Sequence, residues 1–252
     1  MKKETIIKSN ITVGSYSEFI DSVISLSQEK PSSYVCICNV HMLIEANDSQ
    51  EFSEVVNNAD MVSPDGKPVA KGLEWLYGIK QPRIAGMDLI ESLFECITKG
   101  KLSVYLFGST EEVLTKMVAK ATAQFPGIII VGFLSPPFRE LSGQEKNEIV
   151  EKINEHNPDF VFVALGCPKQ ERWMAEHKDK VNSCMIGLGG AFPVYAEAVA
   201  RSPYWMQRNG LEWLYRLYKE PGRLWKRYFY TNSKFLWLFG LQIIKNKLHL
   251  RK

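Results

Sequence analysis

Short apolar runs alternate with longer amphipathic stretches along roughly the first 195 residues of the chain. Runs of about four to eight β-branched and aromatic residues are typical of buried strands, whereas apolar residues three or four positions apart are typical of helices. The apolar runs predict strands at 32–40, 59–66, 101–109, 128–138, 159–166 and 183–192. The amphipathic stretches predict helices at 41–59, 86–100, 109–127, 141–157 and 168–179.

The alternation of strands and helices predicts parallel strands joined by crossover helices. We therefore expect an α/β fold, in which residues 1–197 form a Rossmann-like, mostly parallel sheet flanked by helices. Residues 198–252 are expected to form a separate helical C-terminal appendage. Ser109 and Glu112 have the spacing of a capping box at the start of the helix predicted at 109–127.

The formal net charge of +3 over 252 residues hides a division between the two predicted parts. Residues 201–252 hold twelve Lys or Arg and only two acids, whereas the first 200 residues hold 19 basic and 26 acidic side chains. The same C-terminal segment carries twelve of the 29 aromatic residues. A basic, aromatic-rich segment on an acidic body indicates an anionic partner, which can be a membrane surface, a nucleic acid or a phosphate ligand. The alternative is a helix packed on the body with a solvated basic face.

Several sequence signals are absent. No apolar run follows the first ten residues, as a signal peptide would require, and the longest apolar run, at 235–244, is about half of a membrane span. Five cysteines without metal-ligand spacing favour a reducing cytosol, and Cys36 and Cys38 alternate as small core residues would. The chain has no Asp-x-Asp pair, no phosphate-binding P-loop and only scattered histidines, so we expect no metal and no cofactor.

Polar residues follow several predicted strands, where open α/β sheets bind their ligands. Asn39 could bind a sugar hydroxyl or cap the next helix. Asp65 lies in Ser-Pro-Asp-Gly, which favours a turn, and it could equally be a carboxylate held by that turn for chemistry. Arg83 could bind a phosphate through its planar guanidinium, and Asp88 is expected in the first turn of its helix.

Two glycine-containing junctions could bind an anion. Lys169 and Gln170 start a helix after a strand, where backbone N–H groups are free, although Pro168 could simply open that helix. A second glycine turn, which lacks the spacing of a dinucleotide fingerprint, could lie under a nucleotide base or a diphosphate; it contains Gly187, Gly189 and Gly190.

Arginines alternate with aromatic residues in the C-terminal segment, and such a pattern suits anionic lipid headgroups. The candidates for anion binding are Arg216, Arg223 and Arg227. Arg216 and Arg223 are seven positions apart, which would align them on one helical face, except that Pro221 interrupts the helix between them.

Six stretches, taken in order, resemble the WecG/TagA/CpsF glycosyltransferases, glycosyltransferase family 26. They are NVHMLIEA, NNADMVSPDGKPVA, RIAGMDL, LGCPKQERWM, GLGGAF and GLEWLYRLYKEPGRLWKRY. The resemblance covers residues 34–230. It implies inverting transfer of an N-acetylmannosamine-type sugar or glucose from a UDP-sugar to a polyprenyl-diphosphate-linked acceptor. That activity serves wall teichoic acid, enterobacterial common antigen or exopolysaccharide synthesis at the cytoplasmic face of the membrane.

The resemblance also implies roles for individual residues. Asp65 matches the proposed general base, while Asn39, Arg83 and Gln170 match pocket residues. The basic tail matches the part that touches the membrane and completes the active site. Two positions depart from the family pattern: Ile37 stands where many members have Thr, and Pro193 where many have Asp, which leaves the donor sugar open.

Without a metal-binding acid pair, cationic side chains should stabilise the departing UDP, and we expect membrane docking to deliver Arg216 or Arg223 to the diphosphate. The expected partners are the UDP-sugar, the lipid-linked acceptor and an anionic membrane surface, with no nucleic acid; a homo-oligomer is left open. Two alternatives remain. One is a non-enzymatic protein that binds membranes or nucleic acid, and the other is an α/β enzyme acting on a small nucleotide.

Overall fold

The structure is a computed structural model that describes residues 1–29 and 32–249. Its strands are β1 Lys3–Ile6, β2 Ser9–Thr12, β3 Ser33–Cys38, β4 Met61–Pro64, β5 Ser103–Gly108, β6 Ile129–Leu134, β7 Phe160–Ala164 and β8 Cys184–Gly187. Its helices are α1 Tyr16–Glu29, α2 Val40–Asp48, α3 Gln50–Asn57, α4 Lys67–Tyr77, α5 Gly86–Gly100, α6 Glu111–Gln124, α7 Gly143–Glu155, α8 Lys169–Glu176, the 3-10 turn Gly189–Ala191, α9 Phe192–Tyr195, α10 Tyr204–Asn209, α11 Glu212–Lys219 and α12 Pro221–His249.

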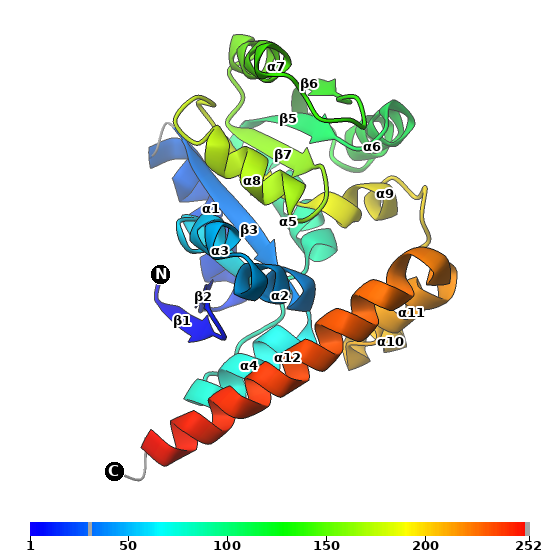
Figure 1. The fold of residues 1–252 in the computed structure, drawn as a ribbon. Helices are drawn as coiled ribbons and strands as arrows, with labels where there is room; N and C mark the ends of the chain where they lie inside the picture. The colour runs from blue at the N-terminus through cyan, green and yellow to red at the C-terminus, as the bar shows by residue number, and fades with distance from the viewer. Residues whose placement is uncertain (30–31, 250–252) are drawn as a thin grey trace.

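Six strands form one parallel sheet in the order β4-β3-β8-β7-β5-β6, which confirms the predicted α/β fold (Figure 1). Each predicted strand corresponds to one strand of this sheet. Helices cover both faces, as a parallel sheet requires, because its strands are joined by crossovers that pass above or below it.

The alternation of side chains along each strand divides the core into two layers. In β3, Tyr34, Cys36 and Cys38 face the layer that includes α2, α3 and α8, whereas Val35 and Ile37 face the layer that includes α1, α5 and α6. Cys36 and Cys38 are fully buried, which confirms them as small core residues. The sheet is therefore apolar on both faces, and polar chemistry is confined to its edges.

The sequence patterns missed four elements and misplaced one helix start. The hairpin β1–β2 turns at Ile7, which has a left-handed φ of 59°, and helices α1 and α4 also lie in stretches without a prediction. The capping box predicted at Ser109 is wrong, because Ser109 has a left-handed backbone conformation and the cap of α6 lies one residue later. This cap is Thr110, whose hydroxyl accepts from the Val113 N–H at 3.3 Å.

The chain leaves the carboxyl ends of β3 and β8 in different directions, and this topology predicts a crevice between the two strands. After β3 the chain enters α2 in one core layer, whereas after β8 it enters the 3-10 turn and α9 in the other layer. Adjacent strands whose continuations leave in opposite directions make the ligand-binding position of open α/β sheets.

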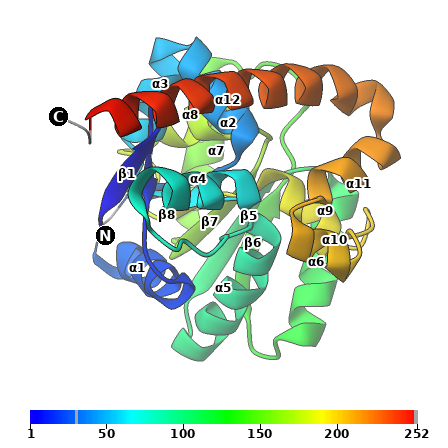
Figure 2. The same ribbon diagram turned by 90° about the horizontal axis from the view of Figure 1, so that it is seen from below.

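The C-terminal helices return across the body. Helix α12 runs along α2 and α4 (Figures 1 and 2), and its Phe235 and Phe239 belong to the core layer that includes α2, α3 and α8. Gly72 of α4 permits this approach, since a Cβ there would lie 3.3 Å from the Phe239 ring. Helix α12 also binds the N-terminal hairpin, where the Ile7 N–H donates to Gln242 Oε1 at 2.8 Å.

Replacement of Phe239 by Ala tests how α12 is held. Phe239 is 4% exposed and stacks on Phe235 at 5.2 Å between ring centroids, so its loss leaves a cavity. We expect the free energy of unfolding to fall by about 3–5 kcal/mol, measured by urea denaturation. Leu236→Ala is the matched control, because Leu236 is 69% exposed on the same helix and should change stability by less than about 0.5 kcal/mol. Equal losses in the two variants would contradict the packing of α12.

Candidate active site

Asp65 lies where β4 ends and α4 begins. Its backbone N–H donates to the Cys38 carbonyl at 2.9 Å, which carries the pairing of β4 with β3 one residue past Pro64. Gly66 has a φ of 83°, a conformation that glycine adopts without strain, and it turns the chain into α4. The two interpretations of Ser-Pro-Asp-Gly are therefore compatible: the segment is a turn, and the turn fixes a half-buried carboxylate at the edge of the sheet.

Asn39 is the single residue between β3 and α2. Its Oδ1 accepts from the Met42 N–H at 3.2 Å and caps α2, while its side chain also hydrogen-bonds Asp65. Because the Asn39 oxygen already accepts from the helix, it is the Asn39 NH2 group that donates to the Asp65 carboxylate. Helix capping and participation in the site are thus compatible roles for Asn39.

Arg83 is held beside Asp65 by its neighbour in the sequence. The Ile84 N–H donates to the Pro64 carbonyl at 3.1 Å, and the Ser63 hydroxyl donates to the Ile84 carbonyl at 2.8 Å. The guanidinium then forms ion pairs with Asp88 of α5, at 3.1 Å, and with Glu212 of α11. Asp88 lies in the first turn of α5, as predicted.

Arg216 comes to the same place from α11. Its Nη1 lies 3.2 Å from the position that a Cβ on Gly190 would take, so Gly190 permits its approach. Burial and the charge of Glu212 raise the pKa of Asp65 to about 6, against the opposing effects of Arg216, Arg83 and the Asn39 hydrogen bond. A carboxyl with this pKa is ionised at neutral pH and is a better proton acceptor than an ordinary aspartate.

Gln170 fills the space beneath the glycine turn after β8. A Cβ on either Gly187 or Gly189 would lie 2.9 Å from its amide, so a larger residue at either position would displace Gln170. The Gly166 N–H donates to Gln170 Oε1 at 3.1 Å, and Gln170 Nε2 donates to Glu171 Oε1 at 2.7 Å. Glu171 is fully buried, and burial raises its pKa to about 7, against the opposing effects of hydrogen bonds that include those of Gln170 and Cys167.

Three candidate residues lie outside the group formed by Asp65, Asn39, Arg83 and Arg216. Lys169 is exposed at the first position of α8. Arg223 is on a separate helix from Arg216 and pairs with Glu220 at 2.5 Å, with 67% of its side chain exposed. Arg227 reaches the start of α2, where burial and the Arg227 charge lower the pKa of His41 to about 4, so that the imidazole is neutral.

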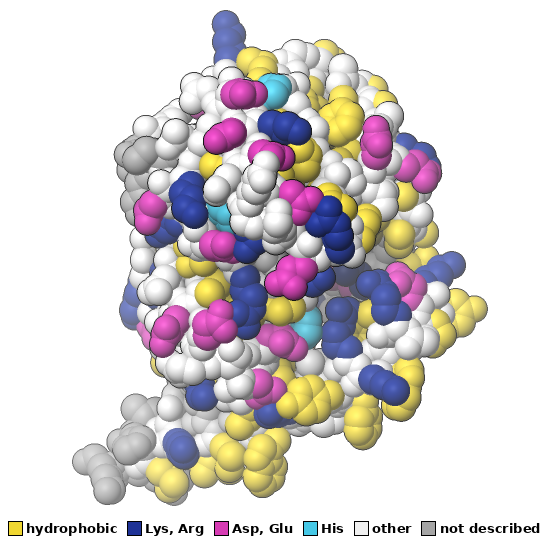
Figure 3. Space-filling view, turned by 45° about the horizontal axis from the view of Figure 1, so that its top comes forward, with side chains coloured by type: hydrophobic (Ala, Val, Ile, Leu, Met, Phe, Trp, Pro, Cys, Tyr) yellow, Lys and Arg dark blue, Asp and Glu magenta, His cyan; other side chains and the backbone are white. Residues whose placement is uncertain are grey.

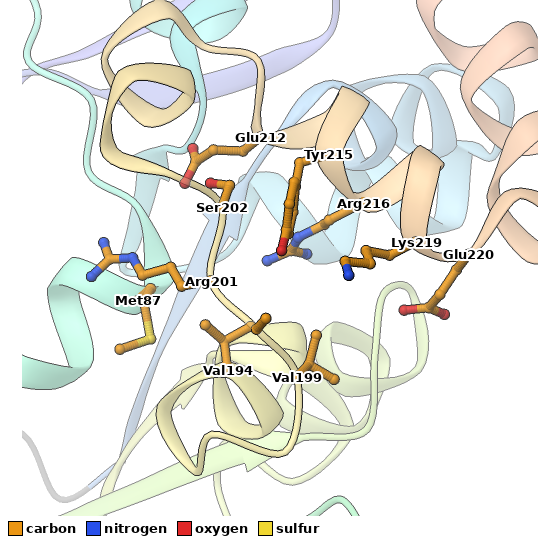
Figure 4. A pocket seen from close by; sticks show the side chains of 11 residues that line it. Met87, Val194, Val199, Arg201, Ser202, Glu212, Tyr215, Arg216, Lys219 and Glu220 are labelled. Atoms are coloured by element: carbon orange, nitrogen blue, oxygen red, sulfur yellow. The ribbon is translucent and has the colours of Figure 1, made fainter.

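A pocket adjoins this group between α11 and the segment that follows α9. Figure 4 shows Arg216 and Lys219 pointing into it from α11, opposite Val194 and Val199. Glu212 and Arg201 also line it. In Figure 3, Lys and Arg side chains gather around a hollow between the body and the C-terminal helices. The pocket therefore has an apolar side, formed by Val194 and Val199, and a charged side on which Arg216 and Lys219 lie beside Glu212 and Glu220.

Sequence reasoning missed Glu212, Arg201 and Glu171 as members of the site. Glu212 and Glu171 lie inside two of the quoted family motifs, GLEW and PKQE, yet their pairing with Arg83 and Gln170 has no local sequence signal. Over residues 1–29 and 32–249, no group of three His, Cys, Asp or Glu side chains could hold a metal ion.

Asp65 thus lies within the electrostatic influence of Arg83 and Arg216, at the carboxyl edge of the parallel sheet where α/β proteins bind their ligands. Comparison with known proteins gives the class: the family model described as Glycosyl transferase WecG/TagA/CpsF family matches residues 4–249. The chain belongs to this family, as its motifs suggested.

Three similar proteins have the same enzyme name. The chain is 31% identical over 233 residues to an N-acetylglucosaminyldiphosphoundecaprenol N-acetyl-beta-D-mannosaminyltransferase of Bacillus subtilis (strain 168), covering 90% of this chain and 87% of the relative. It is 32% identical over 203 residues to the enzyme of that name from Bacillus spizizenii (80% and 76% covered). The enzyme of that name from Staphylococcus aureus (strain MW2) is 28% identical over 233 residues (90% and 85% covered).

Glu171→Gln tests the burial of the carboxyl beneath the glycine turn. Because the folded protein favours protonated Glu171 up to a pH of about 7, the wild type loses stability as pH rises from about 4.5 to 7, whereas Gln cannot ionise. We therefore compare the unfolding free energies of the wild type and the variant. Between pH 4.5 and 8, the difference between them should shift by about 3 kcal/mol in favour of the variant. Urea denaturation at both pH values measures this shift. A pH-independent difference would contradict it, and Glu155→Gln, at an exposed carboxylate, controls for the lost charge.

Proposed function

We propose that this protein transfers an N-acetylmannosamine-type sugar from a UDP-sugar to a polyprenyl-diphosphate-linked N-acetylglucosamine, with inversion at the anomeric carbon. The observation that carries the proposal is the position of Asp65 beside Arg83 and Arg216 at the edge of the sheet, in a chain of a glycosyltransferase family. The names of the relatives support the lipid-linked acceptor and the donor sugar. Family membership also favours an enzyme over the non-enzymatic alternatives.

The proposed reaction is one displacement. The Asp65 carboxylate takes the proton of the acceptor hydroxyl, whose oxygen bonds to the anomeric carbon on the face opposite UDP. The bond between that carbon and the β-phosphate oxygen breaks, and UDP leaves with the electron pair. In this proposal, Arg216 and the N-termini of α2 and α8 stabilise the negative charge that develops on the diphosphate; the approach of Arg216 to Gly190 supports its part.

The donor sugar is the less constrained part of the proposal. Ile37 is 5% exposed and lies in the core layer of α5, so β3 offers an apolar side chain where many members have Thr. Pro193 likewise places no carboxylate in α9. Glucose, the second donor expected from the family resemblance, therefore belongs in every assay of the enzyme.

The C-terminal helices suit peripheral binding at the inner face of the cell membrane. Trp237, Leu241, Ile244 and Leu248 recur at helical spacing on α12, and all four are exposed. Figure 3 shows hydrophobic side chains along the edge of the molecule where α12 runs, close to Lys and Arg. Within the described part of the chain, every helix is too short or too polar to cross a membrane. An apolar stripe flanked by basic residues binds the headgroup region of anionic lipid.

Asp65→Asn tests the proposed base. The amide cannot accept the proton, so we expect kcat to fall by about 10³-fold, with UDP affinity kept to within about threefold. The assay offers UDP-N-acetylmannosamine and UDP-glucose with a polyprenyl-diphosphate-N-acetylglucosamine acceptor, and calorimetry measures UDP binding. In the wild type, kcat/KM should rise with pH through about 6 and then level off, because the base acts ionised.

Asp179→Asn is the matched control, since Asp179 is exposed and follows the far end of α8. It should keep the wild-type rate and pH profile. Unchanged kcat in Asp65→Asn would remove Asp65 from the role of base, and an absence of transfer with every UDP-sugar, despite UDP binding, would overturn the proposed acceptor class.

Vesicle binding tests the membrane-facing stripe. Trp237→Ser combined with Ile244→Ser removes exposed apolar side chains without touching the core, so folding should be unchanged. Co-sedimentation with vesicles of phosphatidylglycerol and phosphatidylcholine should fall by about tenfold, and salt should weaken binding of the wild type. Phe138→Ser, at an exposed aromatic of the body, should leave binding unchanged. Equal binding by all three proteins would place the membrane contact elsewhere.

A further inference from the structure

Four alternating charges link the C-terminal helices to the body. Glu212 pairs with Arg83, Arg83 pairs with Asp88 at 3.1 Å, and Asp88 pairs with Arg201. We call these four residues the charge chain. Its two ends, Arg201 and Glu212, belong to the segment that contains α10, while Arg83 and Asp88 belong to the loop before α5 and to α5. The segment 201–212 is therefore tied to the body at both of its ends.

These pairs are partly withdrawn from water. The side chain of Arg83 is 16% exposed and that of Glu212 is 30% exposed. Charges at this depth are screened less than ion pairs on an open surface, so their attraction is stronger. The charge chain is thus well placed to determine where the C-terminal segment lies.

Helix α11 depends on such a tie because it has no buried residue. Its neighbours are α10 and α12, and Trp213 packs edge-to-face on Tyr228 of α12 at 5.9 Å. Apolar packing against the sheet does not fix its rotation. The pairing of Glu212 with Arg83 is the contact that joins α11 to the loop beside Asp65.

Glu212 and Arg216 are four positions apart, so they lie on one face of α11, one turn from each other. Figure 4 shows both side chains directed to the same side of the helix, toward the body. When Glu212 is held by Arg83, Arg216 is brought over Gly190 and into the electrostatic reach of Asp65. A rotation of α11 about its axis would move both residues together.

We propose that Glu212 is a positioning residue of the transferase: by pairing with Arg83 it fixes helix α11 so that Arg216 faces Asp65 and the departing diphosphate. The inference rests on the proposed function for the role of Arg216, but not for the tie between α11 and the body. The groups that face Asp65 are Glu212, Arg216, Arg83 and Asn39, and Glu212 is the negative one among them.

Hydrogen exchange measured by mass spectrometry tests the tie without any assay of transfer. In Glu212→Gln, which keeps the size of the side chain, the backbone amides of residues 212–219 should exchange about tenfold faster. Glu212→Asp retains the charge and should restore part of the protection. Glu197→Gln is the matched control, because Glu197 pairs with Lys120 of α6, away from Asp65, and should leave exchange in α11 unchanged. Wild-type exchange in Glu212→Gln would overturn the proposal.

Kinetics then test whether Glu212 acts through Arg216. Glu212→Gln should lower kcat by about 10- to 100-fold with little change in KM for the UDP-sugar, and Glu212→Asp should recover part of the rate. In a background of Arg216→Ala, Glu212→Gln should cost nothing more, because the residue that it positions is gone. Fully additive losses would overturn the positioning role. If the wild type transfers no sugar in the panel, the proposed function fails, while the exchange experiment still decides the tie.

Discussion

The hydrogen bond from the Asp65 N–H to the Cys38 carbonyl joins the ends of two parallel strands, and the candidate site depends on it. It places Asp65 beside Asn39, the residue that follows Cys38. It also fixes the Pro64 carbonyl, which accepts a hydrogen bond from the Ile84 N–H. Arg83, the residue before Ile84, therefore lies at the same edge of the sheet. Three residues of the candidate site, from separate parts of the chain, thus share one small network of backbone contacts. Such a network is rigid because its hydrogen bonds continue those of a sheet that is buried on both faces.

Alternating patterns were sufficient to predict the sheet, because each of its six strands is an apolar run bounded by turn residues. The hairpin β1–β2 escaped prediction, since Lys3–Ile6 and Ser9–Thr12 are only four residues each and include polar side chains that bind the body. The start of α6 was misplaced for a local reason: Ser109 and Thr110 are both capping residues, and backbone conformation chooses between them.

Candidate residues at strand ends could be predicted because parallel strands bring their carboxyl ends to one edge. Asn39, Asp65, Gln170 and the glycines after β8 all follow strands of the sheet. Glu212 could not be found in this way, because its partner Arg83 is 129 positions distant and ion pairs leave no periodic trace. Glu171 was hidden for another reason: a buried carboxyl at a helix start resembles an ordinary first-turn acid until its surroundings are known.

The burial of Phe239, which holds α12 on the body, has an entropic consequence. A disordered tail that folds only on a membrane must lose its conformational freedom at the moment of binding, and that loss weakens the affinity gained from each unit of buried surface. Helix α12 loses this freedom when the protein folds, because Phe235 and Phe239 anchor it to the core. For the membrane contact proposed above, the exposed stripe is therefore preorganised, and no such entropy has to be lost on binding.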